Sequence, residues 1–139
     1  MKVFIDANII VATLNKEYPL FTWSARLLSL QSKNNIHLFT SPLCLAIAFY
    51  FSSKKSGEAL AKKKISLLCK NIGVTIIDEV ITKKALANLK VNDFEDGLEY
   101  YSALHHRCDI IVTENQEDFY FSKIEVTGCE EFFNRLKRP

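Results

Sequence analysis

The chain has 139 residues, a length that fits a single domain able to bury a hydrophobic core. Hydrophobic residues make up 48% of the chain and charged residues 24%, which is typical of a globular protein, and no apolar run approaches the length of a membrane span. The net charge of +2 is too small to indicate a nucleic-acid-binding protein by itself.

Short apolar runs alternate with longer amphipathic stretches along the chain. Short continuous apolar runs are typical of buried strands, and apolar stripes with a period near 3.6 residues are typical of helices. In chain order, we predict a strand over 3–5, a helix over 9–14, a helix opening at 19, a strand over 36–40, helices from 42 and over 58–71, a strand over 74–77, helices over 79–90 and 93–107, strands over 109–113 and 124–126, and a last helix. Strands separated by helices predict one α/β domain over residues 1–139, with a parallel sheet covered on both faces.

The helix that follows the second predicted strand has a clear start. Ser41 is a good N-cap, and Pro42 suits the first helical position. The segment 43–51 is apolar all round, so we expect this helix to be buried and to break at residues 54–57.

The cysteines and the N-terminal residues bear on the cellular compartment. The four cysteines are Cys44, Cys69, Cys108 and Cys129. No two have the CxxC spacing, so they indicate a zinc site only weakly, and three lie in apolar runs typical of small core residues. The chain reaches an acidic residue before any hydrophobic segment of signal-peptide length. We therefore expect a cytoplasmic protein with reduced thiols.

Acidic and amide side chains occur at places that this topology brings to one end of the sheet. Asp6 ends the first predicted strand, and Asn8 lies two residues beyond it. Asp96 lies in the first turn of the helix that leads back into the fourth strand, so it lies at the end of the sheet where that strand finishes. The loop after the fourth strand contains Thr113, Glu114, Asn115, Glu117 and Asp118. Ligands of open parallel sheets bind outside the carboxyl ends of the strands, so these groups form a candidate site.

Carboxylates gathered in this way suit a hard divalent cation. Mg²⁺ and Mn²⁺ prefer carboxylate and water oxygens to sulfur, and clustered carboxylates repel one another unless a cation neutralises them. A cation held there can ionise a water molecule and stabilise charge on a phosphate. The alternative is structural: Asp93 and Asp96 can cap and stabilise the helix N-terminus, and Asp6 can cap the helix that follows it.

Lysines are the candidate substrate contacts. Lys54 and Lys55 form one cluster, and residues 62–64 form a second. Such clusters can neutralise phosphates, which makes Lys54 and Lys55 candidates for binding a phosphate-bearing substrate. The alternative is that they are the solvated lysines that surface helices ordinarily carry.

Three segments together resemble the motifs of PIN-domain proteins, a family that includes VapC-type toxins. Segment 3–8 resembles the family's opening strand, where the strand-end Asp, here Asp6, is a metal ligand. Segment 93–104 resembles the third acidic motif, in which the Asp opening the helix, here Asp96, is another ligand.

The last motif resembles segment 109–119. Its Thr matches Thr113, its polar ligand position falls on Asn115, and its Asp-Phe pair begins at Asp118. The resemblance implies a ligand set of Asp6, Asp96, Asn115 and Asp118, supported by Asn8, Asp93 and Thr113.

The resemblance also implies a fold and an activity. The fold is a three-layer α/β/α arrangement around a twisted, mostly parallel sheet. The implied activity is that of a Mg²⁺- or Mn²⁺-dependent endoribonuclease that acts on RNA, as the toxin of a toxin–antitoxin pair does. The resemblance further implies a small antitoxin protein as partner and a homodimer as the assembly.

The chain departs from the family pattern at two positions. The helix after the second strand usually carries a Glu ligand, and Ile47 occupies that position here. Asn115 is neutral where many members have Asp. Fewer ligand charges favour weaker metal binding. These departures motivate a second hypothesis, a catalytically degenerate module that binds RNA or a protein partner. A third, a receiver-like domain accepting phosphate on Asp78, does not match the surrounding pattern.

Overall fold

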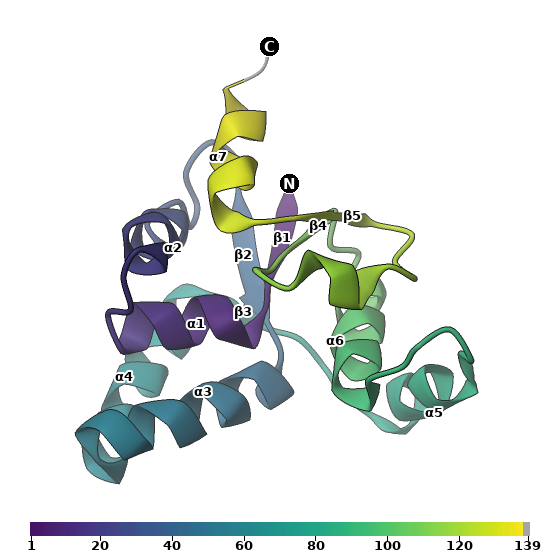
Figure 1. The fold of residues 1–139 in the computed structure, drawn as a ribbon, viewed down its shortest axis with the longest axis horizontal. Helices are drawn as coiled ribbons and strands as arrows, with labels where there is room; N and C mark the ends of the chain where they lie inside the picture. The colour runs from purple at the N-terminus through teal and green to yellow at the C-terminus, as the bar shows by residue number, and fades with distance from the viewer. Residues whose placement is uncertain (138–139) are drawn as a thin grey trace.

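The computed structural model describes residues 1–137 and is built on a five-stranded, all-parallel sheet in the order β3-β2-β1-β4-β5 (Figure 1). The strands are β1 Lys2–Ile5, β2 His37–Thr40, β3 Gly73–Val74, β4 Ile110–Val112 and β5 Glu125–Thr127. The helices are α1 Ala7–Leu14, α2 Leu20–Leu28, α3 Pro42–Ser56, α4 Glu58–Asn71, α5 Glu79–Ala87, α6 Phe94–His105, η1 Gln116–Phe119 and α7 Cys129–Leu136. The predicted α/β class with a parallel central sheet is confirmed.

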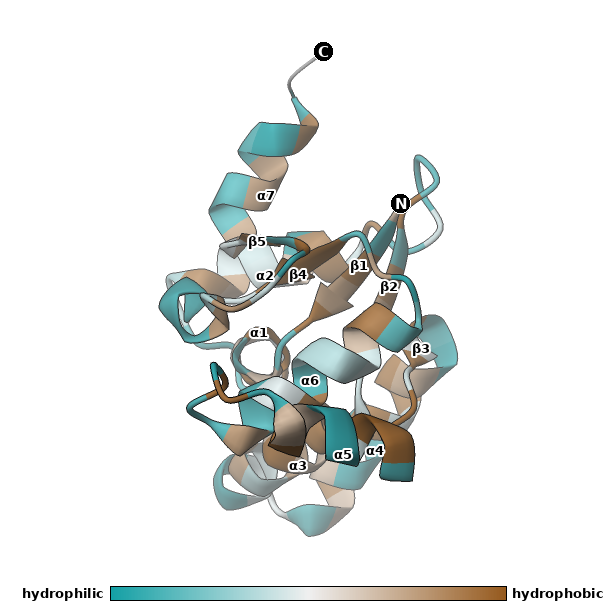
Figure 2. Ribbon diagram, turned by 90° about the vertical axis from the view of Figure 1, so that its right-hand side faces the viewer, coloured by the Kyte–Doolittle hydropathy of each residue, from teal (hydrophilic) through white to brown (hydrophobic). Residues whose placement is uncertain are grey.

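The central strands are buried because their sequences are continuously apolar. Val3, Phe4 and Ile5 of β1 are fully buried, and so are all three residues of β4. Figure 2 shows these strands as mostly brown, the hydrophobic end of its scale. A strand covered on both faces has no solvated side, so continuous runs replace the alternating pattern of a half-exposed strand.

The helices pack in groups around this sheet. Helix α1 contacts α2, and α2 contacts α7; α5 packs on α6, and α3 packs on both α1 and α4. Figures 1 and 2 both place the α3–α4 pair beyond the carboxyl ends of β1 and β2. Within residues 1–137, no helix is both long enough and apolar enough to cross a membrane.

Helix α3 begins as predicted and ends within the predicted range. The Ser41 hydroxyl accepts a hydrogen bond from the Cys44 N–H at 3.1 Å, and Pro42 occupies the first turn. The predicted break at residues 54–57 falls at its last position: the helix continues through Ser56 and stops at Gly57, whose φ of 86° suits glycine.

The prediction that α3 is buried all round was wrong. Only Cys44, Ala48 and Ser52 of α3 are buried, while Tyr50 and Phe51 are 52% and 47% exposed. The helix covers its neighbours along one stripe, and nothing among the described residues covers the opposite face. Apolar composition therefore overstated its burial.

The third strand is shorter than predicted. Pairing with β2 stops at Val74, so residues 75–77 lie beyond the strand. Instead, the hydroxyl groups of Thr75 and Ser102 share a 2.6 Å hydrogen bond, which anchors this segment on α6. An edge strand pairs on one side only, and apolar residues do not extend it by themselves.

Candidate functional site

The strand order reverses between β1 and β4, and this is where the candidate residues meet. From β1 the chain proceeds to β2 and β3 on one side, while β4 and β5 add to the other. Ile5 pairs with Val112, so the next residues, Asp6 and Thr113, leave the sheet side by side. Open parallel sheets bind their ligands at such a reversal, outside the carboxyl ends of the strands.

Asp6 is held by hydrogen bonds to both carboxylate oxygens. Its Oδ1 accepts from the Ala7 N–H at 2.6 Å, and its Oδ2 accepts from the Thr113 hydroxyl at 2.7 Å. The Thr113 oxygen in turn accepts from the Asn8 amide at 3.3 Å and from the Asn115 N–H at 3.1 Å. Asp6 therefore caps α1, as the alternative structural interpretation of this residue predicted. The same hydrogen bonds fix the orientation of its carboxylate at the carboxyl end of β1.

A pocket of about 380 Å³ opens beside Asp6. Six of the residues singled out from the sequence line it: Asp6, Asn8, Asp93, Asp96, Asn115 and Asp118. Ile47 lines it as well, so the α3 position that lacks the usual Glu does face this pocket. Among residues 1–137, none of those lining the pocket is basic. The acids converge without a protein cation to balance them.

The electrostatic consequence is clearest at Asp96. Partial burial, followed by the negative charges of Asp93, Asp6, Asp118 and Glu95, raises the pKa of Asp96 from 3.8 to about 7. Asp93 also accepts a hydrogen bond from the Glu95 N–H at 2.9 Å, so it is an N-cap and a pocket residue at once. A carboxylate whose charge is disfavoured in this way gains most from a nearby cation.

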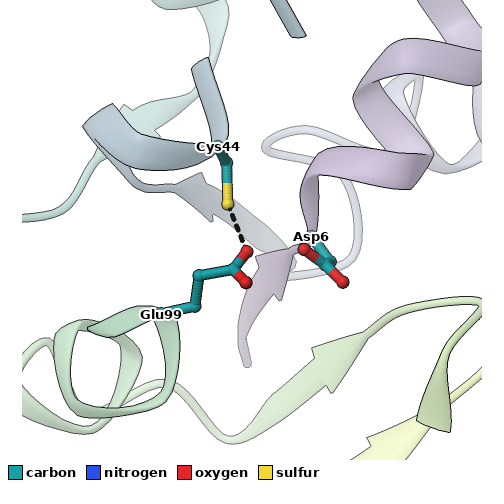
Figure 3. A group of neighbouring side chains, drawn as sticks. All are labelled: Asp6, Cys44 and Glu99. Carbon is teal, nitrogen blue, oxygen red and sulfur yellow. Dashed lines mark hydrogen bonds between the residues drawn. The ribbon is translucent and has the colours of Figure 1, made fainter. Parts of the chain in front are cut away.

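Two groups beside Asp6 were missed from the sequence: Glu99, which lines the pocket, and Cys44, which is fully buried and does not line it. Figure 3 shows the Cys44 thiol, from the first turn of α3, pointing at the Glu99 carboxyl group of α6, which in turn is directed toward Asp6. The Cys44 Sγ lies 2.6 Å from Oε1 of Glu99, and ligand atoms of all three residues lie within 4.8 Å of one another. A signal for Glu99 existed, because positions 93, 96 and 99 are each three apart and such residues share a helix face.

Burial dominates the titration of this inner group. It raises the pKa of Glu99 well above 4.5, assisted by Cys44 and by the negative charge of Asp6. Burial likewise raises the pKa of the Cys44 thiol, with a further contribution from Asp6. Without a cation, Glu99 and Cys44 therefore favour their protonated forms.

The structure does not bring Lys54 and Lys55 into the pocket lining. The Lys55 ammonium donates to the backbone carbonyl of Asn15, just beyond the end of α1, where helix carbonyls lack helical partners. Lys54 lies over the Tyr50 ring, with its Nζ 4.3 Å from the ring centre. Their assignment as substrate contacts stays a prediction, and Lys55 also has a structural role.

Thr113→Val is expected to weaken divalent-metal binding by about 10- to 100-fold, because Asp6 loses the hydroxyl that orients it. Valine keeps the shape of threonine, so the fold is expected to persist. Calorimetric titration with Mn²⁺ measures the change. Thr127→Val is the matched control: Thr127 is equally buried, and its hydroxyl has no hydrogen-bond partner within residues 1–137. Equal affinities in the two variants would contradict a role for Thr113 in positioning Asp6.

The sequence matches the family model for the PIN domain over residues 2–117. The chain therefore belongs to the PIN-domain family. A search of curated proteins by sequence finds no match.

Solved toxin–antitoxin structures share the fold. VapBC2 from Rickettsia felis, bound to a promoter DNA fragment, superposes with a TM-score of 0.71 at 19% identity, covering 91% of this chain and 97% of that one. VapBC-1 from nontypeable Haemophilus influenzae also superposes with a TM-score of 0.71, at 20% identity, covering 94% of this chain and 99% of that one. VapC20 from Mycobacterium tuberculosis, described as a sarcin–ricin loop cleaving toxin, gives 0.64 at 13% identity over 78% and 86%. The resemblance inferred from the sequence motifs is confirmed at the level of family and fold.

Proposed function

We propose that this protein is a metal-dependent endoribonuclease, the toxin half of a toxin–antitoxin pair. The observation that carries the proposal is the pocket at the β1–β4 reversal, lined by Asp6, Asp96, Asn115 and Asp118 without a basic side chain among the described lining residues. VapC20, which has the same fold, is a sarcin–ricin loop cleaving toxin, and two other structures of this fold are those of VapBC2 and VapBC-1.

The residues of the pocket fit a hard divalent cation, Mg²⁺ or Mn²⁺. Three carboxylates and one amide oxygen are the donor types that these ions prefer. The raised pKa of Asp96, caused by burial and then by the neighbouring acids, also favours a site that a positive charge completes. Asp6 and Asp96 would hold the cation, with Asn115 and Asp118 contributing directly or through water.

The chemistry divides between the cation and the chain. A bound divalent cation supplies a Lewis acid that ionises water and stabilises charge developing on an RNA phosphate. Thr113 and the Ala7 N–H keep Asp6 in one orientation, and Asn8 supports Thr113. The exposed side chains of Lys54, Lys62 and Lys63 would attract the RNA backbone, whereas the partly buried Lys64 donates to the carbonyl of Leu14.

The family resemblance extends the proposal to partners and compartment. A small antitoxin would bind over the pocket, and two copies of the chain would form a homodimer. All four cysteines are free thiols in the structure, which is consistent with a cytoplasmic protein.

The experiment incubates the purified chain with a mixed structured RNA in Mn²⁺, Mg²⁺ or EDTA, alongside Asp6→Asn. Cleavage that needs metal and Asp6 is expected. Metal-independent cleavage, or equal cleavage by Asp6→Asn, would contradict the proposal.

A second candidate function, a non-catalytic module that binds RNA or a protein, is favoured by Ile47. This side chain lines the pocket where the family pattern places a Glu. Ile47→Glu separates the two candidates. If the native chain is inactive and Ile47→Glu cleaves RNA, the native protein is the degenerate module.

A further inference from the structure

We propose that Asp6, Cys44 and Glu99 form a second cation position beside the pocket that Asp6 and Glu99 line, one that selects thiol-binding divalent ions such as Zn²⁺ and Co²⁺ over Mg²⁺. This inference rests on the proposed function in one respect: Asp6 is also a ligand of the Mg²⁺ or Mn²⁺ site proposed above, which consists of Asp6, Asp96, Asn115 and Asp118.

The three side chains are brought together by three separate elements. Asp6 follows β1, Cys44 lies in the first turn of α3 and Glu99 lies in the middle of α6. Their ligand atoms lie within 4.8 Å of one another. Ligand atoms bound to one tetrahedral Zn²⁺ are roughly 3.5 Å apart, as follows from bond lengths of about 2.0–2.3 Å. The Cys44 Sγ and Glu99 Oε1 atoms, 2.6 Å apart, would therefore have to separate by roughly 1 Å to bind one ion.

Each group is anchored before any cation binds. Thr113 and the Ala7 N–H orient Asp6, and the Ser41 cap fixes the backbone of Cys44. Glu99 is only 2% exposed, yet within residues 1–137 the Cys44 thiol is its one hydrogen-bond donor. Its carboxyl group therefore reaches the pocket with acceptor capacity left over, directed toward Asp6 (Figure 3).

Charge gives a reason for a ligand at this position. Asp6 is 7% exposed and Glu99 2% exposed, and the described lining of the pocket contains no basic residue that could pair with them. Buried acids at this separation must share protons or a cation. Three protein ligands with one open position are the arrangement of catalytic zinc sites.

The thiol sets the preference among metals. Sulfur ligands suit Zn²⁺ and Co²⁺, whereas Mg²⁺ takes oxygen. Glu99 also supplies from α6 a carboxylate in the pocket where α3 carries Ile47 instead of an acid. The departure from the family pattern is thereby a relocation of one ligand to another helix, together with a change of ligand chemistry.

The test titrates the full chain with Co²⁺ and records the thiolate-to-cobalt charge-transfer absorption. We expect a band that saturates at one equivalent and is displaced by Zn²⁺ but not by excess Mg²⁺. Cys44→Ser is expected to abolish the band. Glu99→Gln is expected to weaken Co²⁺ binding by at least about 10-fold, since the ligand charge falls. Cys69→Ser, which changes the exposed thiol, is the control and keeps the band. Circular dichroism verifies that each variant is folded.

Two results would overturn the inference: no charge-transfer band in the native chain, or a band that Cys69→Ser removes and Cys44→Ser keeps. The first would leave a protonated, hydrogen-bonded Glu99–Cys44 pair as a purely structural contact. Failure of the second cation position can be distinguished from failure of the proposed nuclease function. Mn²⁺-dependent RNA cleavage without a cobalt band overturns the inference alone, whereas a cobalt band without any RNA cleavage supports it and contradicts the nuclease.

Discussion

Asp96→Asn is expected to lower metal-dependent RNA cleavage on the order of 10³-fold while the chain stays folded. A metal ion contributes several kcal/mol of transition-state stabilisation, and each ~1.4 kcal/mol is a factor of ten in rate. Asparagine keeps the size of Asp96 but removes the charge that would hold the cation. Asp96 is only half-buried in the first turn of α6, and a neutral side chain there relieves repulsion from Asp93, Asp6 and Asp118. Initial rates on a labelled RNA in Mn²⁺ measure the loss.

Asp78→Asn is the matched control for this substitution. Asp78 caps α5 by accepting a 3.0 Å hydrogen bond from the Ile81 N–H, and it does not line the pocket. Asparagine is an equally good N-cap, so fold and cleavage should be unchanged. If Asp96→Asn cleaves as fast as Asp78→Asn, the proposed ligand set is wrong.

The second large effect concerns stability and pH. In EDTA, we expect the native chain to be more stable near about pH 5 than near about pH 8, because of its raised carboxyl pKa values. Burial, and then the neighbouring acids, raises the pKa of Asp96 from 3.8 to about 7 in the folded chain. Burial also raises the pKa of Glu99 well above 4.5.

The sign follows from proton counts. Between the unfolded and folded pKa values, the folded protein holds a proton that the unfolded chain has released. The free energy of unfolding therefore falls as pH rises through that interval. For Asp96 the fall runs from about pH 4 to about pH 7, and for Glu99 it continues above its unfolded value of 4.5. Metal binding should reverse the trend at the upper end, because the cation favours the ionised acids.

Glu99→Gln isolates the contribution of the most buried carboxyl group to the pH dependence of stability. The amide cannot ionise, so the variant should be more stable than the native chain near about pH 8 in EDTA, with little difference near about pH 5. We expect a rise in melting temperature at the higher pH, because the raised pKa of Glu99 stabilises the native chain only at lower pH. The same variant should bind metal less well. A lower melting temperature at the higher pH would mean that Glu99 is ionised and stabilised by a partner.

Local pattern was sufficient for the elements that build the sheet. The continuous apolar runs before Asp6 and around Ile111 predicted β1 and β4, because a strand buried on both faces has no polar alternation. Ser41 with Pro42 predicted the start of α3, since capping depends on a few neighbouring residues. The reversal of strand order then brought Asp6, Asp96 and Asp118 together as expected.

Burial of individual faces did not follow from composition. The apolar segment of α3 was expected to be enclosed, and Tyr50 and Phe51 are half exposed. Lys55 was singled out only as a candidate RNA contact, and its ammonium also bonds the carbonyl of Asn15, 40 positions away in the chain, a contact that was not predicted. Both outcomes depend on which part of the chain a helix packs against, and the sequence of a single segment does not specify that partner.

The amino-acid sequence by itself determined the α/β class, the strand-end position of Asp6 and the membership of the PIN-domain family. Those features depend on short-range periodicity and on motif spacing along the chain. Only the tertiary structure decided that Cys44 and Glu99, 55 positions apart, meet beside Asp6. That contact follows from the packing of α3 against α6, two helices that are distant in the chain and meet only when the sheet is assembled.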